Sequence, residues 1–176
     1  MIAAITVIGL VVLAALWWFV GGGSAAVTGS HSDGGGGGFA GEPASATMTV
    51  TSVHDGDTLY LDPGTGDDLK VRLIGIDTPE IGENAECFGA EARDRTRALL
   101  PEGTVVTAVT EAGALDQYGR SLPHGDLAGG THVNRVLIDE GFAWAMFFDP
   151  NRGFEGEFRD AERAAEAAEV GLWGAC

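Results

Sequence analysis

Lysine is almost absent from this sequence, and acidic residues greatly outnumber basic ones. The only lysine is Lys70, and 10 basic residues stand against 26 acidic ones, which gives a net charge of −16. Such an excess argues against a polyanionic partner, because nucleic-acid binding relies on cationic contacts with phosphates. It is also typical of proteins from salt-loving organisms, where ~1 M salt shortens the Debye length to about 3 Å. The overall charge therefore does not exclude nucleic acid as a partner. The local arrangement of arginines has to show whether phosphates can bind.

Histidine and cysteine are scarce as well. The chain has four histidines and two cysteines, and no internal repeat is visible. The histidine positions have no metal-ligand spacing, which indicates solvated or packing roles. They are His31, His54, His124 and His132.

Charge is also missing from residues 1–20. A run of about 20 apolar residues is long enough to cross a bilayer, and Trp17 and Trp18 at one end suit a membrane interface. This segment is therefore predicted to be a transmembrane anchor. A cleaved signal peptide is the first alternative, with a cleavage site near Ser24 to Ala26, and a buried core helix is the second. The anchor and the signal peptide both place the remaining chain outside the cytoplasm.

Glycine, serine and alanine dominate residues 21–46, with five consecutive glycines at 34–38. Such a segment cannot bury enough apolar surface to offset its chain entropy. We interpret it as a flexible tether with a root-mean-square span of roughly 25–30 Å. The folded domain is predicted to occupy residues 47–176.

Within that domain, alternating β-branched segments predict strands and a 3.6-residue apolar period predicts helices. Pro123 interrupts the fifth strand, so this strand should be short or bent. The predicted strands are 47–53, 58–62, 69–76, 103–110 and 118–127, and the predicted helices are 89–100, 132–141 and 154–169. The order of these elements favours an α+β domain built on a small closed five-stranded barrel.

Opposite charges stand at the two ends of the strand-like stretch "RLIGIDTPE". Arg72 precedes the apolar run, while Asp77 and Glu80 follow it. Buried charges are costly unless they are paired or bind a metal. A phosphate held by a cation would explain a guanidinium at one end and carboxylates at the other. A surface ion-pair cluster at the end of a strand is the alternative.

Two further motifs carry charge in turns. "HDGDTLY" places Asp55, Gly56 and Asp57 in a tight connection between two strands, and "DQYGR" ends in Arg120. Asp-Gly-Asp alone is a common turn. It also invites comparison with the aspartyl-phosphate phosphatases, but here Thr58 follows the second aspartate directly and no parallel βαβ sheet surrounds it.

Taken together and in this order, "DGDTLYL", "VRLIGIDTPE" and "DQYGR" resemble the thermonuclease (staphylococcal nuclease-like) family. The resemblance runs from about residue 48 to 174 and includes "VNRVLIDEGFA" and the closing "GLW". It implies an OB-fold-like barrel with about three helices. It also implies calcium-dependent hydrolysis of phosphodiester bonds in DNA, with RNA left open, by in-line attack of water that yields 3′-phosphate ends.

The resemblance assigns roles to five charged or polar residues. Asp57 and Asp77 match the carboxylate ligands of calcium, and Thr78 matches the residue that lends its backbone carbonyl. This agrees with the preference of Ca²⁺ for several oxygen ligands. Arg72 and Arg120 match the two phosphate-binding arginines, and a guanidinium grips phosphate oxygens in a bidentate manner.

Further roles follow from the same resemblance. Glu80 matches the residue proposed as general base for the attacking water. Tyr118 matches a residue near the phosphate of the nucleotide, although an aromatic that merely flanks a turn is the alternative. The aromatic platform of the family falls on Phe147 and Phe148, where tyrosine is usual. Phenylalanine stacks on a base but cannot donate a hydrogen bond to phosphate.

Cys87 and Cys176 are predicted to form a disulfide. In the related fold, the C-terminal segment returns near the start of the first helix, and an even cysteine count in an exported domain favours pairing. Two unpaired thiols are the alternative. For the whole chain, we expect a nuclease that acts outside the cytoplasm, is anchored or secreted, and has no protein partner. A nucleic-acid-binding barrel without strong catalysis and an envelope-anchored structural domain are the rival classes.

Overall fold

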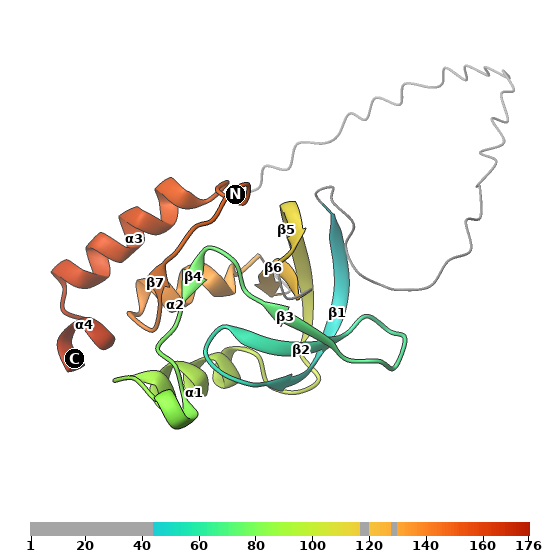
Figure 1. Cartoon of the computed structure of the whole chain (residues 1–176), viewed down its shortest axis with the longest axis horizontal. Helices are drawn as coiled ribbons and strands as arrows, with labels where there is room; N and C mark the ends of the chain where they lie inside the picture. The colour runs from blue at the N-terminus through green and yellow to red at the C-terminus, as the bar shows by residue number, and fades with distance from the viewer. Residues whose placement is uncertain (1–43, 117–119, 128–129) are drawn as a thin grey trace, which may run out of the picture. The chain divides into compact units, whose positions relative to one another are not determined.

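The computed structural model describes residues 44–116, 120–127 and 130–176, coloured in Figure 1. The predicted apolar segment 1–20, nearly all of the predicted linker and Tyr118 lie outside these residues. Across the described ranges, no helix combines the length and the apolar character that crossing a bilayer requires.

A closed barrel of five strands forms the centre of the domain. Its order is β1-β2-β3-β6-β5, and β5 pairs back to β1. All neighbouring strands are antiparallel except β3 and β6, which are parallel. The strands are β1 (Ser45–Val53), β2 (Thr58–Asp62), β3 (Leu69–Arg72), β5 (Val105–Leu115) and β6 (Ser121–Leu127). The predicted α+β class and five-stranded barrel are confirmed.

The burial of β1 shows how its sequence fills the barrel. Met48 and Val50 are buried, as period-2 alternation requires, but the next buried residue is Val53. The register between β1 and β2 shifts between Val50 and Ser52. A bulge adds one residue to a strand, so the apolar side chains on both sides of it still face the core.

One predicted strand is wrong as a continuous element. The segment 69–76 divides, because β3 ends at Arg72 and the next strand, β4 (Ile76–Asp77), pairs instead with β7 (Trp144–Ala145). Gly75 lies between them with a φ of 76°, a conformation that glycine adopts without steric penalty. A Cβ at this position would also come within 2.9 Å of the Phe158 ring.

The three predicted helices are present with slightly shorter bounds, and a short fourth helix was not predicted. They are α1 (Gly89–Leu99), α2 (Val133–Asp139), α3 (Glu155–Ala167) and α4 (Leu172–Ala175), with a 3₁₀ turn at Gly82–Asn84. The α3 helix buries Phe158, Ala161 and Ala165, which confirms its predicted apolar stripe. Figure 1 shows α3 and α4 on the side of the domain away from β1, with α2 packed between β6 and α3.

The fifth predicted strand is short, as the position of Pro123 indicates, and it begins later than the predicted bound of residue 118. It begins at Ser121, and Pro123 lies opposite Thr110, where the register between β5 and β6 becomes irregular. This position agrees with the confinement of proline to edges and bulges. The described structure also joins Cys87 to Cys176 in a disulfide with Cα atoms 6.0 Å apart, as predicted.

Candidate active site

The turn between β1 and β2 fixes the position of Asp57. The Asp55 carboxylate accepts hydrogen bonds from the backbone N–H groups of Asp57, at 3.1 Å, and Thr58, at 2.7 Å. From α1, the Thr96 hydroxyl donates to the Gly56 carbonyl oxygen at 2.6 Å. A short acidic side chain that bonds its own following backbone stabilises a tight turn. The Asp-Gly-Asp motif is therefore a turn that presents its second aspartate inward.

Asp57 is a buried carboxylate with several partners. It is 6% exposed, and its Oδ2 accepts hydrogen bonds from the backbone N–H and the hydroxyl of Thr78, at 2.8 and 2.9 Å. Its Oδ1 lies 3.0 Å from Nε of Arg72. Burial nevertheless raises the pKa of Asp57 to about 7, against the opposing effect of the Arg72 guanidinium. The negative charge here is thus incompletely compensated.

Arg72 connects this carboxylate to β4. Its Nη1 donates to the carbonyl oxygens of Leu73 and Ile76 at 2.7 and 3.0 Å, and its Nη2 donates to Asp77 Oδ1 at 2.7 Å. In one continuous strand, residues 72 and 77 would face opposite sides and stand about 16 Å apart. The bend at Gly75 is therefore what brings Arg72 and Asp77 into contact.

Two carboxylates share this one guanidinium. Burial also raises the pKa of Asp77, opposed by Arg72 and reinforced by the nearby charge of Glu86. A pair of partly desolvated carboxylates with one cationic partner has the donor chemistry that suits a hard cation such as Ca²⁺. No cluster of three or more metal-binding His, Cys, Asp or Glu side chains occurs within the described residues. Backbone, water or substrate oxygens would have to supply the remaining ligands.

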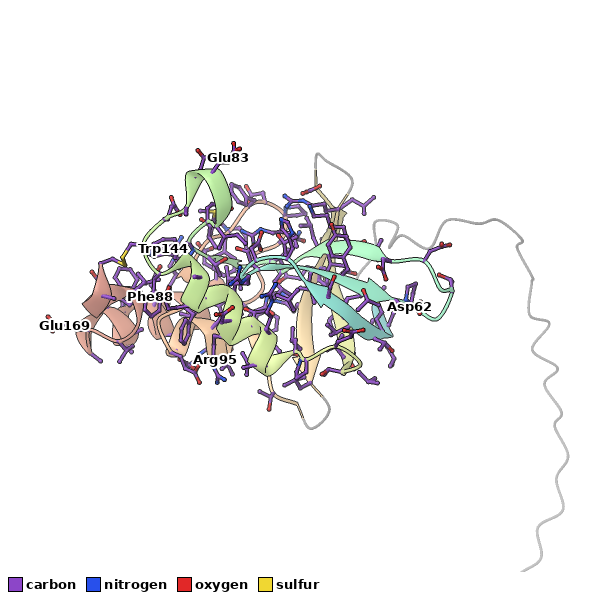
Figure 2. The ribbon with its side chains drawn as sticks, turned by 90° about the horizontal axis from the view of Figure 1, so that it is seen from below. Asp62, Glu83, Phe88, Arg95, Trp144 and Glu169 are labelled. Carbon is purple, nitrogen blue, oxygen red and sulfur yellow. A yellow bond between two sulfur atoms is a disulfide. The ribbon has the colours of Figure 1, made fainter. Side chains whose placement is uncertain are left out.

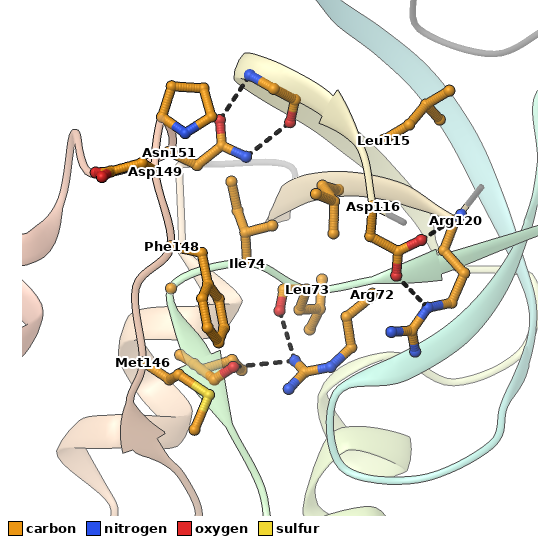
Figure 3. A pocket seen from close by; sticks show the side chains of 15 residues that line it. Arg72, Leu73, Ile74, Leu115, Asp116, Arg120, Met146, Phe148, Asp149 and Asn151 are labelled. Atoms are coloured by element: carbon orange, nitrogen blue, oxygen red, sulfur yellow. Dashed lines mark hydrogen bonds and ion pairs between the residues drawn. The ribbon is translucent and has the colours of Figure 1, made fainter. Parts of the chain in front are cut away.

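A cavity of about 540 Å³ lies beside this network (Figure 3). Arg72 and Arg120 both line it, and Figure 3 shows the two guanidinium groups on the same side of the space. Arg120 Nε contacts Asp116 Oδ2 at 2.6 Å, and the Arg120 backbone N–H donates to the other oxygen of Asp116 at 2.8 Å. The structure thus brings together the two arginines that the sequence motifs predict.

The predicted aromatic pair separates in the structure. Phe148 is 73% exposed and lines the cavity across from Arg72. Phe147 points elsewhere: its ring packs 5.8 Å from that of Phe158, and Arg159 lies 5.9 Å from its centroid. Met146 lines the cavity instead. In an extended segment, residues 146 and 148 share a side and residue 147 faces away.

Glu80 lies outside the set of residues that line the cavity. Its side chain is exposed, and its backbone pairs with Glu86. Thr78 contacts Asp57 through its backbone N–H and its hydroxyl, and the predicted ligand role of its carbonyl stays a prediction. Tyr118 belongs to the residues that the structure does not describe, so its role stays a prediction.

Sequence reasoning missed two residues that shape the cavity. Asp116 orients Arg120, and its position four residues earlier in "DQYGR" was an available signal. Asn151 holds the loop after β7 against β5, because its amide accepts from the Gly113 N–H at 2.8 Å and donates to the Gly113 carbonyl at 2.7 Å. Nothing local in the sequence distinguishes this asparagine from one in an ordinary turn.

The barrel thus carries two arginines on one cavity, beside a pair of partly buried carboxylates. Guanidinium groups placed in this way are suited to bind an anion. Residues 70–175 match the sequence model of the family described as "Staphylococcal nuclease homologue". The chain belongs to this family.

Individual relatives match at about the same level. The "Thermonuclease" of Staphylococcus hyicus is 32% identical over 130 residues, covering 72% of this chain and 75% of that protein. The "Thermonuclease" of Staphylococcus intermedius is 33% identical over 127 residues, covering 70% and 74%. The "Endonuclease YhcR" of Bacillus subtilis is 31% identical over 134 residues, covering 70% of this chain but 11% of that protein.

Proposed function

We propose that this protein is a calcium-dependent nuclease that hydrolyses phosphodiester bonds in DNA, with RNA open as a second substrate and 3′-phosphate ends as products. The observation that carries the proposal is that Arg72 and Arg120 line one cavity next to the Asp57 and Asp77 carboxylates. Family membership and the thermonuclease relatives support the same activity.

The two arginines would act on the scissile phosphate. A guanidinium is always charged and binds phosphate oxygens through two parallel N–H groups. It also stabilises the extra negative charge of a pentacoordinate transition state. Arg72 is held to backbone carbonyls of Leu73 and Ile76, so its guanidinium is positioned before substrate arrives.

Asp57 and Asp77, with the backbone carbonyl of Thr78, would hold Ca²⁺. When bound, Ca²⁺ would supply positive charge beside the phosphate oxygens. Its charge would also offset the effect of burial, which is the main cause of the raised pKa of both carboxyl groups. Glu80 would orient and deprotonate the attacking water from the loop that follows β4.

Phe148 and Met146 would form the apolar wall for the nucleotide. An exposed aromatic ring beside a phosphate-binding cavity suits stacking of a base, worth about 1–3 kcal/mol. Because phenylalanine lacks a hydroxyl, this wall would contribute stacking without a hydrogen bond to phosphate.

We also propose that the domain acts outside the cytoplasm, anchored or secreted. Two observations support this. Residues 1–20 carry no charge, and disulfides such as Cys87–Cys176 persist mainly in oxidising compartments.

The test is the substitution Glu80→Gln, with Glu83→Gln in the same exposed loop as its matched control. Removing a general base should lower kcat by roughly 10²–10⁴-fold while DNA binding is retained, and the control should stay near wild type. The assay measures acid-soluble nucleotides released from DNA, with and without a calcium chelator, across a salt series.

The same assay separates the rival classes. A nucleic-acid-binding barrel would retain DNA without releasing nucleotides, and a structural domain would do neither. Wild-type protein that releases no nucleotides at any calcium or salt concentration would contradict the proposal.

A further inference from the structure

The loop that carries Glu80 is closed by one residue, Glu86. The Glu86 carboxylate accepts a hydrogen bond from the Glu80 backbone N–H at 3.0 Å, and the Glu86 N–H donates to the Glu80 carbonyl at 2.9 Å. Gly89, the first residue of α1, packs directly on the same carbonyl, since a Cβ at this position would overlap the oxygen. The backbone of Glu80 is therefore fixed from two directions.

The residue after Glu86 is covalently tied to the end of the chain. Cys87 bonds to Cys176, and Phe88, with a φ of 73°, stacks on Phe142 with ring centroids 5.3 Å apart. Figure 2 shows the yellow disulfide at the same end of the domain as the labelled Phe88. The position of Glu86 thus depends on how firmly this end is held.

The C-terminal segment is itself anchored to the domain. Leu172 is 4% exposed, and its N–H donates to the Gly141 carbonyl at 2.8 Å. The Cys176 N–H donates in turn to the Leu172 carbonyl at 3.0 Å. The disulfide therefore ties Cys87 to a segment that is itself packed and hydrogen-bonded to the domain.

We propose that Glu86 is a positioning residue for Glu80, that the Cys87–Cys176 disulfide anchors Glu86, and that turnover consequently depends on the oxidation state of this disulfide. The inference rests on the proposed function, because it assigns Glu80 a role in the reaction. Cys87 is adjacent to Glu86, and Glu86 bonds the backbone of Glu80. Breaking the disulfide could therefore displace Glu80 without a change elsewhere in the domain.

Glu86 also carries a charge that acts on the neighbouring Asp77. A loss of activity on removing Glu86 would therefore have two explanations, the lost hydrogen bond and the lost charge. Glutamine separates them, because its amide oxygen accepts the Glu80 N–H while its side chain is neutral.

The first experiment compares Glu86→Ala with Glu86→Gln in the full chain, using DNA and calcium. Displacement of a reacting group by about 1 Å can lower rates by up to ~10²-fold, so the alanine variant should lose about tenfold or more in kcat with KM within about twofold. The glutamine variant should stay within about threefold of wild type. Equal losses in both variants, or none in alanine, would overturn the positioning role.

The second experiment reduces the disulfide. Dithiothreitol transfers two electrons and two protons to the bond, which leaves two thiols and the cyclic disulfide of the reagent. Reduction should lower kcat about fivefold or more, within the range that small displacements produce, while far-ultraviolet circular dichroism stays native. The double variant Cys87→Ser and Cys176→Ser is the matched control and should show the lowered kcat with no response to dithiothreitol. Unchanged kcat on reduction would overturn the redox dependence.

A third measurement does not require activity. Amide hydrogen exchange should show protection of the Glu80 N–H in wild type and in Glu86→Gln, and loss of that protection in Glu86→Ala and on reduction. If the exchange changes as expected but wild type cleaves no DNA, the proposed function fails and the loop assignment stands. If wild type cleaves DNA but neither exchange nor kcat responds, the inference fails alone.

Discussion

Two partly buried polar clusters in this domain differ in the sign of the charge that burial disfavours. The carboxylate cluster consists of Asp57, Arg72, Asp77 and Thr78. The histidine cluster consists of His124, His132 and Glu111, with His124 Nε2 2.7 Å from Glu111 Oε1. Burial raises the pKa of both aspartates, whereas burial lowers the pKa of both histidines.

The two clusters also differ in how their polar atoms are used. Both Asp57 oxygens have close partners. In the histidine cluster, Nδ1 of His124 and both ring nitrogens of His132 have no hydrogen-bond partner among the described residues. These rings pack instead edge-on against Phe154 and Phe158. Burial thus disfavours the charged form of the aspartates in the first cluster and of the histidines in the second.

The largest effect should come from removing the shared cation of the carboxylate cluster. Arg72→Gln should lower kcat on DNA by about 10²-fold or more, because it removes stabilisation of transition-state charge. Arg135→Gln is the control, since Arg135 lies on α2 in exposed ion pairs with Asp139 and Glu157. Steady-state kinetics with saturating calcium measure both. Similar losses in the two variants would remove the distinction between the site and the surface.

A smaller effect should appear in stability. The Asp57 pKa is raised from 3.8 to about 7, so its contribution to stability is present below about pH 3.8 and is lost as pH rises towards 7. Without calcium at pH 8, Asp57→Asn should therefore raise the free energy of unfolding by about 1–3 kcal/mol. Urea unfolding at pH 4 and pH 8 measures the difference.

Calcium should oppose the stability advantage that Asp57→Asn has over wild type in the absence of the ion. A ligand that binds only the folded state stabilises it, so calcium should raise the melting temperature of wild type and leave Asp57→Asn unchanged. An equal calcium effect on both proteins would place the ion elsewhere.

The smallest effect should be the loss of stability that follows protonation of His132 as the pH falls. The pKa of His132 is lowered by burial and by the neighbouring His124, so its contribution is present above the unfolded value of about 6.5 and is lost as pH falls below it. His132→Phe, which keeps an aromatic ring against Phe154, should reduce the loss of stability between pH 7 and pH 5. Parallel unfolding curves for the variant and wild type across this range would contradict the assignment.

Much of the barrel follows from local sequence. The predicted strand at 58–62 has the same bounds as β2, and the charged motifs identify both arginines that line the cavity. These elements were predictable because period-2 alternation and turn residues act over a few positions.

The rest depends on tertiary structure. The bend at Gly75 divides a segment whose composition is that of one strand. A side chain is excluded there by the positive φ and by the packing of Phe158 and Phe147, which local sequence does not reveal. Whether Phe147 or Phe148 lines the cavity depends on which side of the loop faces it. Asn151 holds this loop by pairing with Gly113, which lies 38 residues earlier in the chain. The hydrogen bond between the Glu86 carboxylate and the Glu80 N–H likewise depends on how the loop folds, and the local sequence pattern does not predict it.

The parallel seam of the barrel has a consequence for motion. Within the described residues, β3 and β6 share one register pair, Val71 with Ser121, and each member of this pair is next to a cavity arginine. Strand pairs held by few backbone hydrogen bonds open locally at low free energy without global unfolding. We therefore expect the distance between Arg72 and Arg120 to fluctuate as β3 and β6 separate and pair again.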